Sequence, residues 1–397
     1  MMIYIIPAWY PQDEKDITAC FFREQAHALA DRGHDVTVIH IEPLSVTRIG
    51  QMPFHSRREW QDGNVRTIFH KVIVPVPAKL GDIQDHYISE LYYKIIKKQI
   101  DEDEANGLAK PELLHAHVSH SCAYYCLKAS KKLGIPLVVT EHYSGLLLGT
   151  ATEREYRRVR DTIEGADAFI FVGTNFKKAI TEKLKTTKET YYIPNMLPND
   201  MAAKTCLTEQ AHTPFTFLTA CHLKENKSVD LAIKAFHEAF EPEEDVKLII
   251  AGDGTELPKL KALADELNEN RIEFYGRYSR EESQELFSQA DAFVLTSKVE
   301  TFGIVYLEAM NCGLPCIATK GQGGDDIIDD KNGILVDYGD IEQLKIAMRK
   351  IKEDYGNYSR SAIAKSCRDR FSQGAVVGQI AEKYESVSGR PRGGNKR

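Results

Sequence analysis

The chain has 397 residues, which is long for one domain and enough for two. With a net charge of −7, it lacks the basic excess typical of nucleic-acid-binding proteins, so we predict no nucleic-acid partner. Residues 1–195 carry equal numbers of basic and acidic residues, so the whole net charge falls on residues 196–397. The first half is therefore the half better suited to an anionic surface.

The cysteines and the N-terminus indicate a reducing compartment. None of the eight cysteines forms a CxxC pair, and the i,i+4 pairs Cys122/Cys126 and Cys312/Cys316 have no second pair or histidine at zinc-finger spacing. We predict free, buried thiols and no metal site. The opening MMIYIIPAWY is too short for a secretory signal, and no apolar run approaches the ~20 residues of a membrane span. We therefore expect a cytoplasmic protein.

Short apolar runs alternate with amphipathic stretches through the first half. The predicted elements are strand 2–6, helix 17–32, strand 36–41, an irregular or hairpin insertion 42–64, strands 65–69 and 72–76, an amphipathic stretch 87–100, a solvated acidic turn 101–104, strand 113–117, helix 121–133, and strands 137–140, 168–172 and 191–193. The first strand, helix and strand span about forty residues, which fits a parallel βαβ unit.

The same alternation restarts in the second half. The predicted elements are strand 215–220, helix 229–240, strand 246–251, helix 257–267, strand 272–275, helix 281–289, strand 291–296, helix 304–311, strand 315–318, a short helix 325–328, strand 334–336, helix 341–352 and a helical stretch 358–387. The pattern predicts an α/β protein with two doubly wound, Rossmann-like parallel sheets. In such sheets ligands bind beyond the carboxyl ends of the strands, so we expect two domains that face each other across a cleft.

A turn cluster at Pro194-Asn195 and Pro198-Asn199-Asp200 marks the predicted domain boundary. We predict an N-terminal domain at 1–198, a C-terminal domain at 199–372 and a C-terminal helix at 373–387. A basic, glycine-rich tail follows at 388–397 and is predicted to be disordered.

The stretch from Ser297 to Thr319 contains the strongest chemical signal. Glu300 lies on the loop after a predicted strand, and Glu308 lies seven intervening residues later in a helix that starts near Ile304. A helix start presents free N–H groups and a positive dipole end to an anion, and Gly303 lets the backbone approach closely. Two carboxylates beside an anion site suit a nucleotide sugar. The alternative is that Glu308 faces solvent and Glu300 only neighbours the helix cap.

Other candidate residues follow neighbouring strands of the second half. Lys227 lies just before a helix, where a lysine can hold a phosphate, and His222 occupies the same loop. Gly252 and Gly254 surround a strand-to-helix turn, while Arg277 and Tyr278 follow the next strand and could offer backbone groups and a ring to a base. An ordinary surface lysine, a structural histidine and a tight turn are the alternatives.

Histidines gather at predicted strand ends in the first half. His142 follows the run LVVT, and His115, His117 and His120 lie at the end of LLHAH. We expect His115 and His117 to point to opposite faces of their strand, which argues against a shared zinc ion. A single histidine that is hydrogen-bonded to a donor sugar fits this pattern better than a metal site.

Taken together, these motifs resemble the retaining glycosyltransferases of family 4, which have a GT-B fold. The resemblance covers nearly the whole chain. It implies that residues 1–198 form an acceptor-binding domain, that residues 199–372 form a nucleotide-sugar-binding domain, and that the helix at 373–387 crosses back to the first domain. Its most specific part is ETFGIVYLEAM followed by GLPCIAT, which is similar to that family's E-x7-E signature. The other matching motifs, in chain order, are DRGHDVTVI, VTEH, YYIPN, AGDG and NGILVDYGD.

The resemblance implies a role for each residue of the motif. Glu300 would contact the hydroxyls of the donor sugar, and Phe302, Gly303 and Ile304 would supply backbone contacts to sugar and diphosphate. Glu308 would bind the ribose, Lys227 would neutralise the diphosphate, and His142 would lie by the donor sugar. The sequence departs from the family pattern at two places: His222 stands where an arginine usually grips the diphosphate, and the loop after the first strand lacks the usual glycine pair.

We therefore predict a retaining hexosyltransferase that moves a sugar from a nucleotide-diphosphate sugar to an acceptor hydroxyl, in cell-surface polysaccharide or glycolipid synthesis. We expect no cofactor or metal, and we favour a UDP-sugar over a GDP-sugar as co-substrate. The acceptor would be a saccharide or a lipid-linked saccharide. The alternatives are a nucleotide-sugar epimerase or glycan phosphorylase on the same fold, and a catalytically silent sugar-nucleotide-binding protein.

Two basic patches suggest peripheral contact with an anionic membrane. Tyr92, Tyr93 and Ile96 with three lysines would form one patch, and the arginines of residues 154–160 would form the other. Ordinary solvated helix faces are the alternative.

Overall fold

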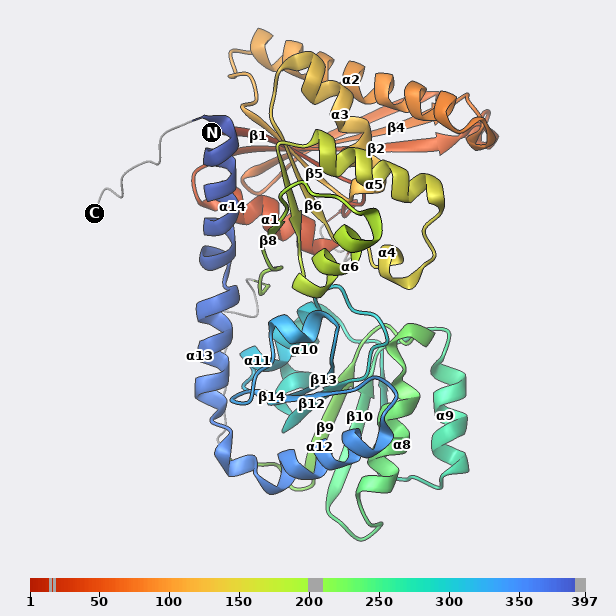
Figure 1. Cartoon of the computed structure of the whole chain (residues 1–397), viewed down its shortest axis with the longest axis vertical. Helices are drawn as coiled ribbons and strands as arrows, with labels where there is room; N and C mark the ends of the chain where they lie inside the picture. Colours follow the sequence, from red (N-terminus) through yellow and green to blue (C-terminus); the bar gives the residue numbers. More distant parts are fainter. Residues whose placement is uncertain (14–15, 17–18, 199–209, 390–397) are drawn as a thin grey trace, which may run out of the picture. The chain divides into compact units, whose positions relative to one another are not determined.

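The computed structural model describes residues 1–13, 16, 19–198 and 210–389, so most of the predicted boundary at 198–200 and most of the predicted tail lie outside the described residues. The chain divides into two compact units. Unit 1 consists of Met1–Val172, Lys177–Ile193 and the chain from Val376 onward, and unit 2 consists of Gly173–Phe176 and Pro194–Ala375. Both units are mostly parallel sheets covered by helices, which confirms the predicted α/β class (Figure 1).

The sheet of unit 1 has the strand order β3-β4-β2-β1-β5-β6-β7-β8. Its strands are β1 Met2–Pro7, β2 Asp35–Ser45, β3 His55–Asp62, β4 Val65–Val74, β5 Leu113–His117, β6 Leu137–Glu141, β7 Ala168–Phe171 and β8 Tyr191–Tyr192. Only β3 is antiparallel to its neighbour. The chain adds β2 to one side of β1 and later adds β5 to the other side, so the direction of strand addition reverses at β1. The carboxyl ends of β1 and β5 therefore form a topological switch point, where doubly wound sheets bind ligands.

Helices cover both faces of this sheet. They are α1 Cys20–Asp31, α2 Asp82–Ala105, α3 Tyr124–Leu133, α4 Gly145–Leu148, α5 Glu153–Gly165, α6 Thr174–Leu184 and α14 Gln373–Ser388, with short helical turns η1 Val46–Arg48, η2 Ala78–Leu80 and η3 Ser119–Ala123. Right-handed crossovers place α1 on one face and α2, α3 and α5 on the other. On α14, the fully buried Tyr384 hydroxyl bonds to His115 of β5 at 2.6 Å, so this helix is part of the core of unit 1.

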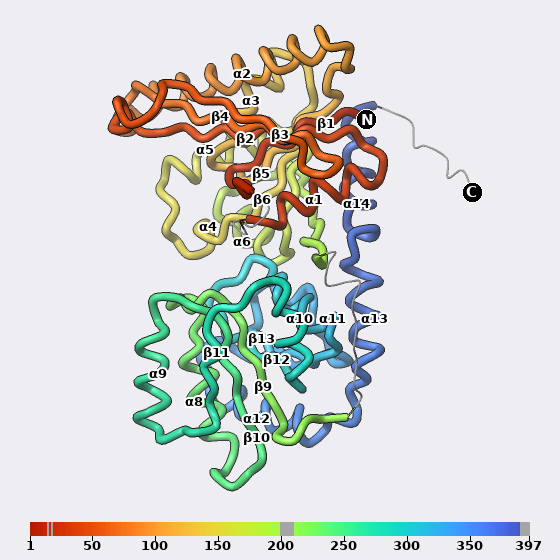
Figure 2. The backbone as a smooth tube through the Cα atoms, turned by 180° about the vertical axis from the view of Figure 1, so that it is seen from behind, coloured from red at the N-terminus to blue at the C-terminus, as the bar shows by residue number. Residues whose placement is uncertain are grey.

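Unit 2 is a six-stranded parallel sheet of order β11-β10-β9-β12-β13-β14. Its strands are β9 Phe215–Ala220, β10 Val246–Ala251, β11 Ile272–Gly276, β12 Ala292–Leu295, β13 Cys316–Thr319 and β14 Gly333–Val336. Its helices are α8 Val229–Ala239, α9 Leu257–Glu266, α10 Arg280–Ser288, α11 Ile304–Asn311, α12 Ile341–Glu353 and α13 Arg360–Phe371, with turns η4 Glu225–Lys227, η5 Gly323–Asp326 and η6 Tyr355–Asn357. Helix α8 packs with α9 and α12, and α11 packs with α10 and α13 (Figure 2). The switch point here lies between β9 and β12.

Several predicted boundaries in the first half and at the C-terminus are wrong. The strands predicted at 65–69 and 72–76 are one strand, β4, because His70 and Lys71 pair in register with β2. The acidic run 101–104 is the last part of α2 and not a solvated turn. Its Asp103 is 1% exposed and accepts hydrogen bonds from Arg66, Gln99 and Tyr4. The helical stretch 358–387 is two helices, α13 and α14.

The two surfaces predicted to contact a membrane are also wrong in detail. Tyr92 and Ile96 are buried in the core of unit 1, because the apolar face of α2 packs onto α3. Of the arginines in α5, Arg154 and Arg158 bind the buried Asp85. Membrane contact therefore stays a prediction, with the exposed lysines of α2 and the exposed Arg157 and Arg160 of α5 as its remaining basic residues. Among the described residues, no helix is long and apolar enough to cross a membrane.

The described cysteines are free, as predicted: five are buried, and Cys20 and Cys221 are partly exposed. Cys206 lies outside the described residues. Among the described residues, no group of three or more histidine, cysteine, aspartate or glutamate side chains is placed to hold a metal ion.

Candidate functional site

The candidate site lies at the switch point of unit 2. Lys227 ends η4, the short turn that follows β9, and Glu300 lies on the loop that follows β12. Because β9 and β12 are neighbours in the sheet, their carboxyl ends bring these two loops together. The structure thus joins residues that are 73 positions apart in the sequence.

Lys227 and Glu300 form a shielded ion pair. The Lys227 Nζ donates to Glu300 Oε2 at 2.5 Å, and the two side chains are only 19% and 13% exposed. Burial alone would lower the pKa of Lys227, but the Glu300 carboxylate outweighs it and the pKa is raised. Lys227 therefore keeps its positive charge at neutral pH, with one carboxylate as its partner in the ligand-free chain.

The loop after β13 fixes the backbone of Glu300. The Glu300 N–H donates to Gln322 Oε1 at 3.0 Å, and the Glu300 carbonyl accepts from the Gly323 N–H at 2.9 Å. A Cβ on Gly323 would lie 2.3 Å from the Phe302 carbonyl oxygen, so only glycine fits there. We did not predict this support, although the glycine-rich run GQGG after a predicted strand was a usable signal.

Replacing Gly323 by alanine should therefore displace the Glu300 loop. A new Cβ would meet backbone atoms that cannot rotate away, so we expect destabilisation by about 2 kcal/mol or more and weakened nucleotide binding. Thermal unfolding with and without UDP measures both effects. The matched control is Gly356→Ala, where a Cβ meets nothing within 4 Å. Equal behaviour of the two variants would contradict this role of Gly323.

Gly303 shapes the start of α11. It has φ 90° and its missing Cβ would lie 2.6 Å from the ring of Tyr306, so the chain turns tightly from Glu300 into a helix that begins at Ile304. Phe302 is fully buried and packs against Phe371, so its side chain anchors the loop and only its backbone is left for a ligand. The predicted backbone contacts of Phe302, Gly303 and Ile304 to a ligand stay predictions.

Glu308 lies on α11, partly buried. Burial raises the pKa of the Tyr278 hydroxyl, and the nearby negative charge of Glu308 raises it further. These two predicted residues are therefore neighbours in space. Arg277 by contrast is 80% exposed and pairs loosely with Asp253 at 3.5 Å.

The turn after β10 packs on the loop after β9. Added Cβ atoms on Gly252 and Gly254 would lie 1.9 Å from the Cys221 carbonyl oxygen and 2.2 Å from that of Leu223. Only glycine fits at these two positions, because the two loops approach each other closely. It also positions His222, whose exposed ring donates from Nδ1 to the Asp253 carbonyl at 2.5 Å and keeps Nε2 available.

His142 belongs to unit 1, whereas the residues above belong to unit 2. Its Nε2 lies 3.2 Å from Nδ1 of His117, and its ring packs against Phe21 and Phe22. The adjacent Glu141 is fully buried and accepts from the His142 N–H at 2.8 Å, which fixes the start of the loop. Contact of His142 with a donor sugar stays a prediction.

Our expectation that His115 and His117 face opposite ways is wrong. Residues two apart in a strand share a face, and the two rings are 4.3 Å apart. Burial lowers the pKa of His115 to about 3, and its two nitrogens bond to Tyr384 and Thr140. His115 is therefore a neutral structural residue that ties β5 to β6 and α14.

Comparison with known proteins identifies both halves of the chain. Residues 208–370 match the family "Glycosyl transferases group 1", and residues 21–199 match "Glycosyltransferase Family 4". An N-acetyl-alpha-D-glucosaminyl L-malate synthase of Bacillus anthracis is 26% identical over 70% of this chain and 75% of its own length. An uncharacterized glycosyltransferase of Methanocaldococcus jannaschii is 28% identical over 88% and 94%.

Solved structures show the same fold over almost the whole chain. The apo form of the lipopolysaccharide outer core galactosyltransferase WaaB superposes with a TM-score of 0.71 at 19% identity, covering 97% of this chain and 99% of its own. Anabaena HepE in complex with UDP and glucose superposes with a TM-score of 0.68 at 19% identity, covering 97% and 100%. At this identity the likeness establishes the GT-B fold.

Proposed function

We propose that this chain, a member of the glycosyltransferase superfamily whose two domains these families describe, transfers a hexose from a nucleoside diphosphate sugar to an acceptor hydroxyl. The product keeps the anomeric configuration of the donor. The observation that carries the proposal is the shielded Lys227–Glu300 pair at the switch point of unit 2. It joins a fixed cation, suited to a diphosphate, to a carboxylate suited to sugar hydroxyls.

In this proposal each group of the site has one task. Lys227 moves from Glu300 to the diphosphate as the donor binds, and the carboxylate it leaves accepts hydrogen bonds from the sugar. The free N–H groups at the start of α11 face the diphosphate. Glu308 accepts from the ribose hydroxyls, and Tyr278 lies beside the base. The complex of HepE with UDP and glucose supports UDP as the nucleotide.

The proposed step needs neither a metal nor a covalent enzyme intermediate. The bond from the anomeric carbon to the diphosphate oxygen breaks, and the acceptor oxygen bonds to that carbon on the same face. The acceptor proton passes to the departing phosphate, while Lys227 and the α11 dipole stabilise the charge that develops there. Lipopolysaccharide and glycolipid enzymes among the relatives support a role in cell-surface polysaccharide or glycolipid synthesis.

A thermal-shift panel of UDP- and GDP-sugars tests the donor site. A donor at a hundred times its dissociation constant should stabilise the protein by about 2.7 kcal/mol. Glu308→Ala should abolish most of this shift, whereas Glu285→Ala, which removes an exposed carboxylate from the neighbouring helix α10, should preserve it. An unchanged shift in Glu308→Ala would remove Glu308 from the nucleotide site.

A further inference from the structure

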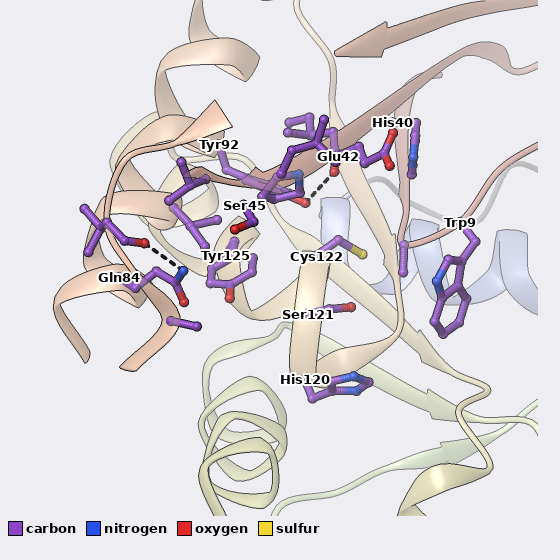
Figure 3. A pocket seen from close by; sticks show the side chains of 18 of the residues that line it. Trp9, His40, Glu42, Ser45, Gln84, Tyr92, His120, Ser121, Cys122 and Tyr125 are labelled. Atoms are coloured by element: carbon purple, nitrogen blue, oxygen red, sulfur yellow. Dashed lines mark hydrogen bonds between the residues drawn. The ribbon is translucent and has the colours of Figure 1, made fainter. Parts of the chain in front are cut away.

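Unit 1 contains a cavity of about 600 Å³ that the donor site does not use. It is lined by the loops that follow β1 and β5, by the ends of β2 and β4, and by one side of α2. The cavity therefore lies at the switch point of unit 1 (Figure 3). The exposed ring of Trp9 stands at one side of it.

Two polar side chains on the α2 side of the wall donate to the backbone of the protein itself. The Tyr92 hydroxyl donates to the Ile41 carbonyl at 3.0 Å, and the Gln84 amide donates to the Val76 carbonyl at 2.9 Å, as the dashed lines in Figure 3 show. The bond to Val76 leaves the Gln84 carbonyl oxygen as an acceptor and one amide hydrogen as a neutral donor.

Donors at the ends of β2 and β5 are used in the same way. His40 Nδ1 lies 3.1 Å from the Pro7 carbonyl, so it carries the proton and leaves Nε2 as an acceptor. Burial lowers the pKa of His40, which keeps this ring neutral. The Cys122 thiol donates to the His117 carbonyl. The wall thus offers a ligand acceptors at His40 and Gln84 and neutral donors such as the Trp9 indole N–H, but no described cationic donor.

The charges of the wall are negative. Asp16 and Glu42 are among the lining residues, and no described lining residue is a lysine or an arginine. Glu42 pairs with Lys71 at 3.4 Å, and Lys71 is outside the lining. Behind Tyr125, Arg154 and Arg158 bind Asp85.

The start of η3 is a positive feature of the wall, because a helix start attracts anions. A carboxylate of the protein itself already binds this helix start. The fully buried Glu141 accepts from the Ser119 N–H at 2.8 Å and from the Ser119 hydroxyl. An anionic ligand would therefore meet the carboxylate of Glu141 behind this helix end, with Glu42 on the opposite wall.

We propose that this cavity binds a neutral, hydroxyl-rich ligand and excludes ligands that carry a phosphate or a carboxylate. Resting on the proposed function, this ligand is the acceptor, and the acceptor class is an uncharged saccharide or glycoside. Its hydroxyls donate to Glu42, to Nε2 of His40 and to the Gln84 carbonyl oxygen. Its apolar face packs on Trp9 and on the aromatic wall around Tyr125.

Two glycosides that differ only at one carbon test the proposal. In p-nitrophenyl glucoside that carbon bears a hydroxymethyl group, and in p-nitrophenyl glucuronide it is a carboxylate. Calorimetric titration of the full chain should give at least about tenfold tighter binding of the glucoside, because the carboxylate meets like charges. Glu42→Lys should reduce this preference several-fold. Glu104→Lys, an exposed position on α2 outside the cavity, should leave it unchanged.

Equal or tighter binding of the glucuronide to the unaltered chain would overturn the proposal. So would the absence of binding of either glycoside at millimolar concentration, or a preference that Glu42→Lys leaves intact. UDP-induced thermal stabilisation, measured on the same samples, reports on the donor site in unit 2. Failure of the proposed function would remove that stabilisation, whereas failure of the acceptor proposal would leave it.

Discussion

Lys227→Ala is expected to lower kcat/KM for sugar transfer by at least about a hundredfold, which corresponds to roughly 3 kcal/mol of transition-state stabilisation. The leaving diphosphate gains negative charge as its bond to the sugar breaks, and Lys227 is the cation that the structure holds in a shielded position at the switch point. Its raised pKa keeps it charged across the neutral range, so the loss should be nearly independent of pH between 6 and 9.

Initial rates of UDP release in the presence of acceptor measure this loss. The control is Lys224→Ala, which removes an exposed lysine from the same loop and should keep the rate within about threefold of the unaltered chain. If both variants lost activity equally, the effect would reflect general attraction of the donor and not a specific contact of Lys227.

Asp85→Ala is expected to destabilise unit 1 by about 3–5 kcal/mol, because it leaves two arginines without their carboxylate. Asp85 is 4% exposed, and its carboxylate pairs with Arg154 at 2.6 Å and with Arg158. Arg158 is itself only 9% exposed. Its charge would have no other carboxylate within salt-bridge distance among the described residues.

Denaturant unfolding measures this loss, and Asp82→Ala is its control. Asp82 is 77% exposed and pairs with an exposed Arg157, so its removal should cost less than about 1 kcal/mol. A loss at Asp85 as small as the loss at Asp82 would contradict the role we give to the buried cluster.

The pH dependence of the Asp85 contribution follows from the direction of its pKa shift. Burial alone would raise the pKa of Asp85, but the hydrogen bonds from Arg154 and Arg158 outweigh it and the pKa is lowered. The stabilisation is therefore complete above the unfolded pKa of aspartate and is lost as the pH falls through the lower folded pKa. The difference between the unaltered chain and Asp85→Ala should shrink only in acid.

Sequence patterns predicted unit 2 closely because its strands are buried on both faces. A parallel strand covered by helices reads as a short apolar run, as in β9, β10 and β12, and Gly252 directly ends the run of β10. The bounds of α11 were predicted to the residue, because Gly303 and Gly313 delimit the helix. The same patterns correctly predicted two mostly parallel sheets.

The first unit was harder because charged residues take part in its core. Asp103 belongs to the acidic run that was predicted to be a solvated turn, but it is buried against Arg66. Asp85, for which we made no prediction, is likewise buried against Arg154 and Arg158. Such partners are tens of residues away in sequence, so local periodicity does not reveal them. Tyr92 and Ile96 were assigned to a surface for the same reason, since the partner helix α3 was not considered.

Within the candidate site, sequence motifs predicted the candidate residues but not how they are held. That Lys227 and Glu300 meet depends on β9 and β12 being neighbours, which follows from the strand order and not from spacing. The support of Glu300 by Gln322 and Gly323 likewise depends on β13 lying beside β12. His222 keeps its place by a bond to a backbone carbonyl, which no side-chain pattern encodes.

The most direct test of the account is to follow the donor and the product by NMR, with a UDP-hexose and a neutral glycoside acceptor. We predict acceptor-dependent release of UDP and a new glycosidic bond with the donor's anomeric configuration, both lost in Lys227→Ala. An inverted product would contradict the proposed retention, and conversion of the donor without acceptor would indicate an epimerase. Binding of UDP-hexose without any turnover across donors and acceptors would contradict the account and leave a silent sugar-nucleotide-binding protein.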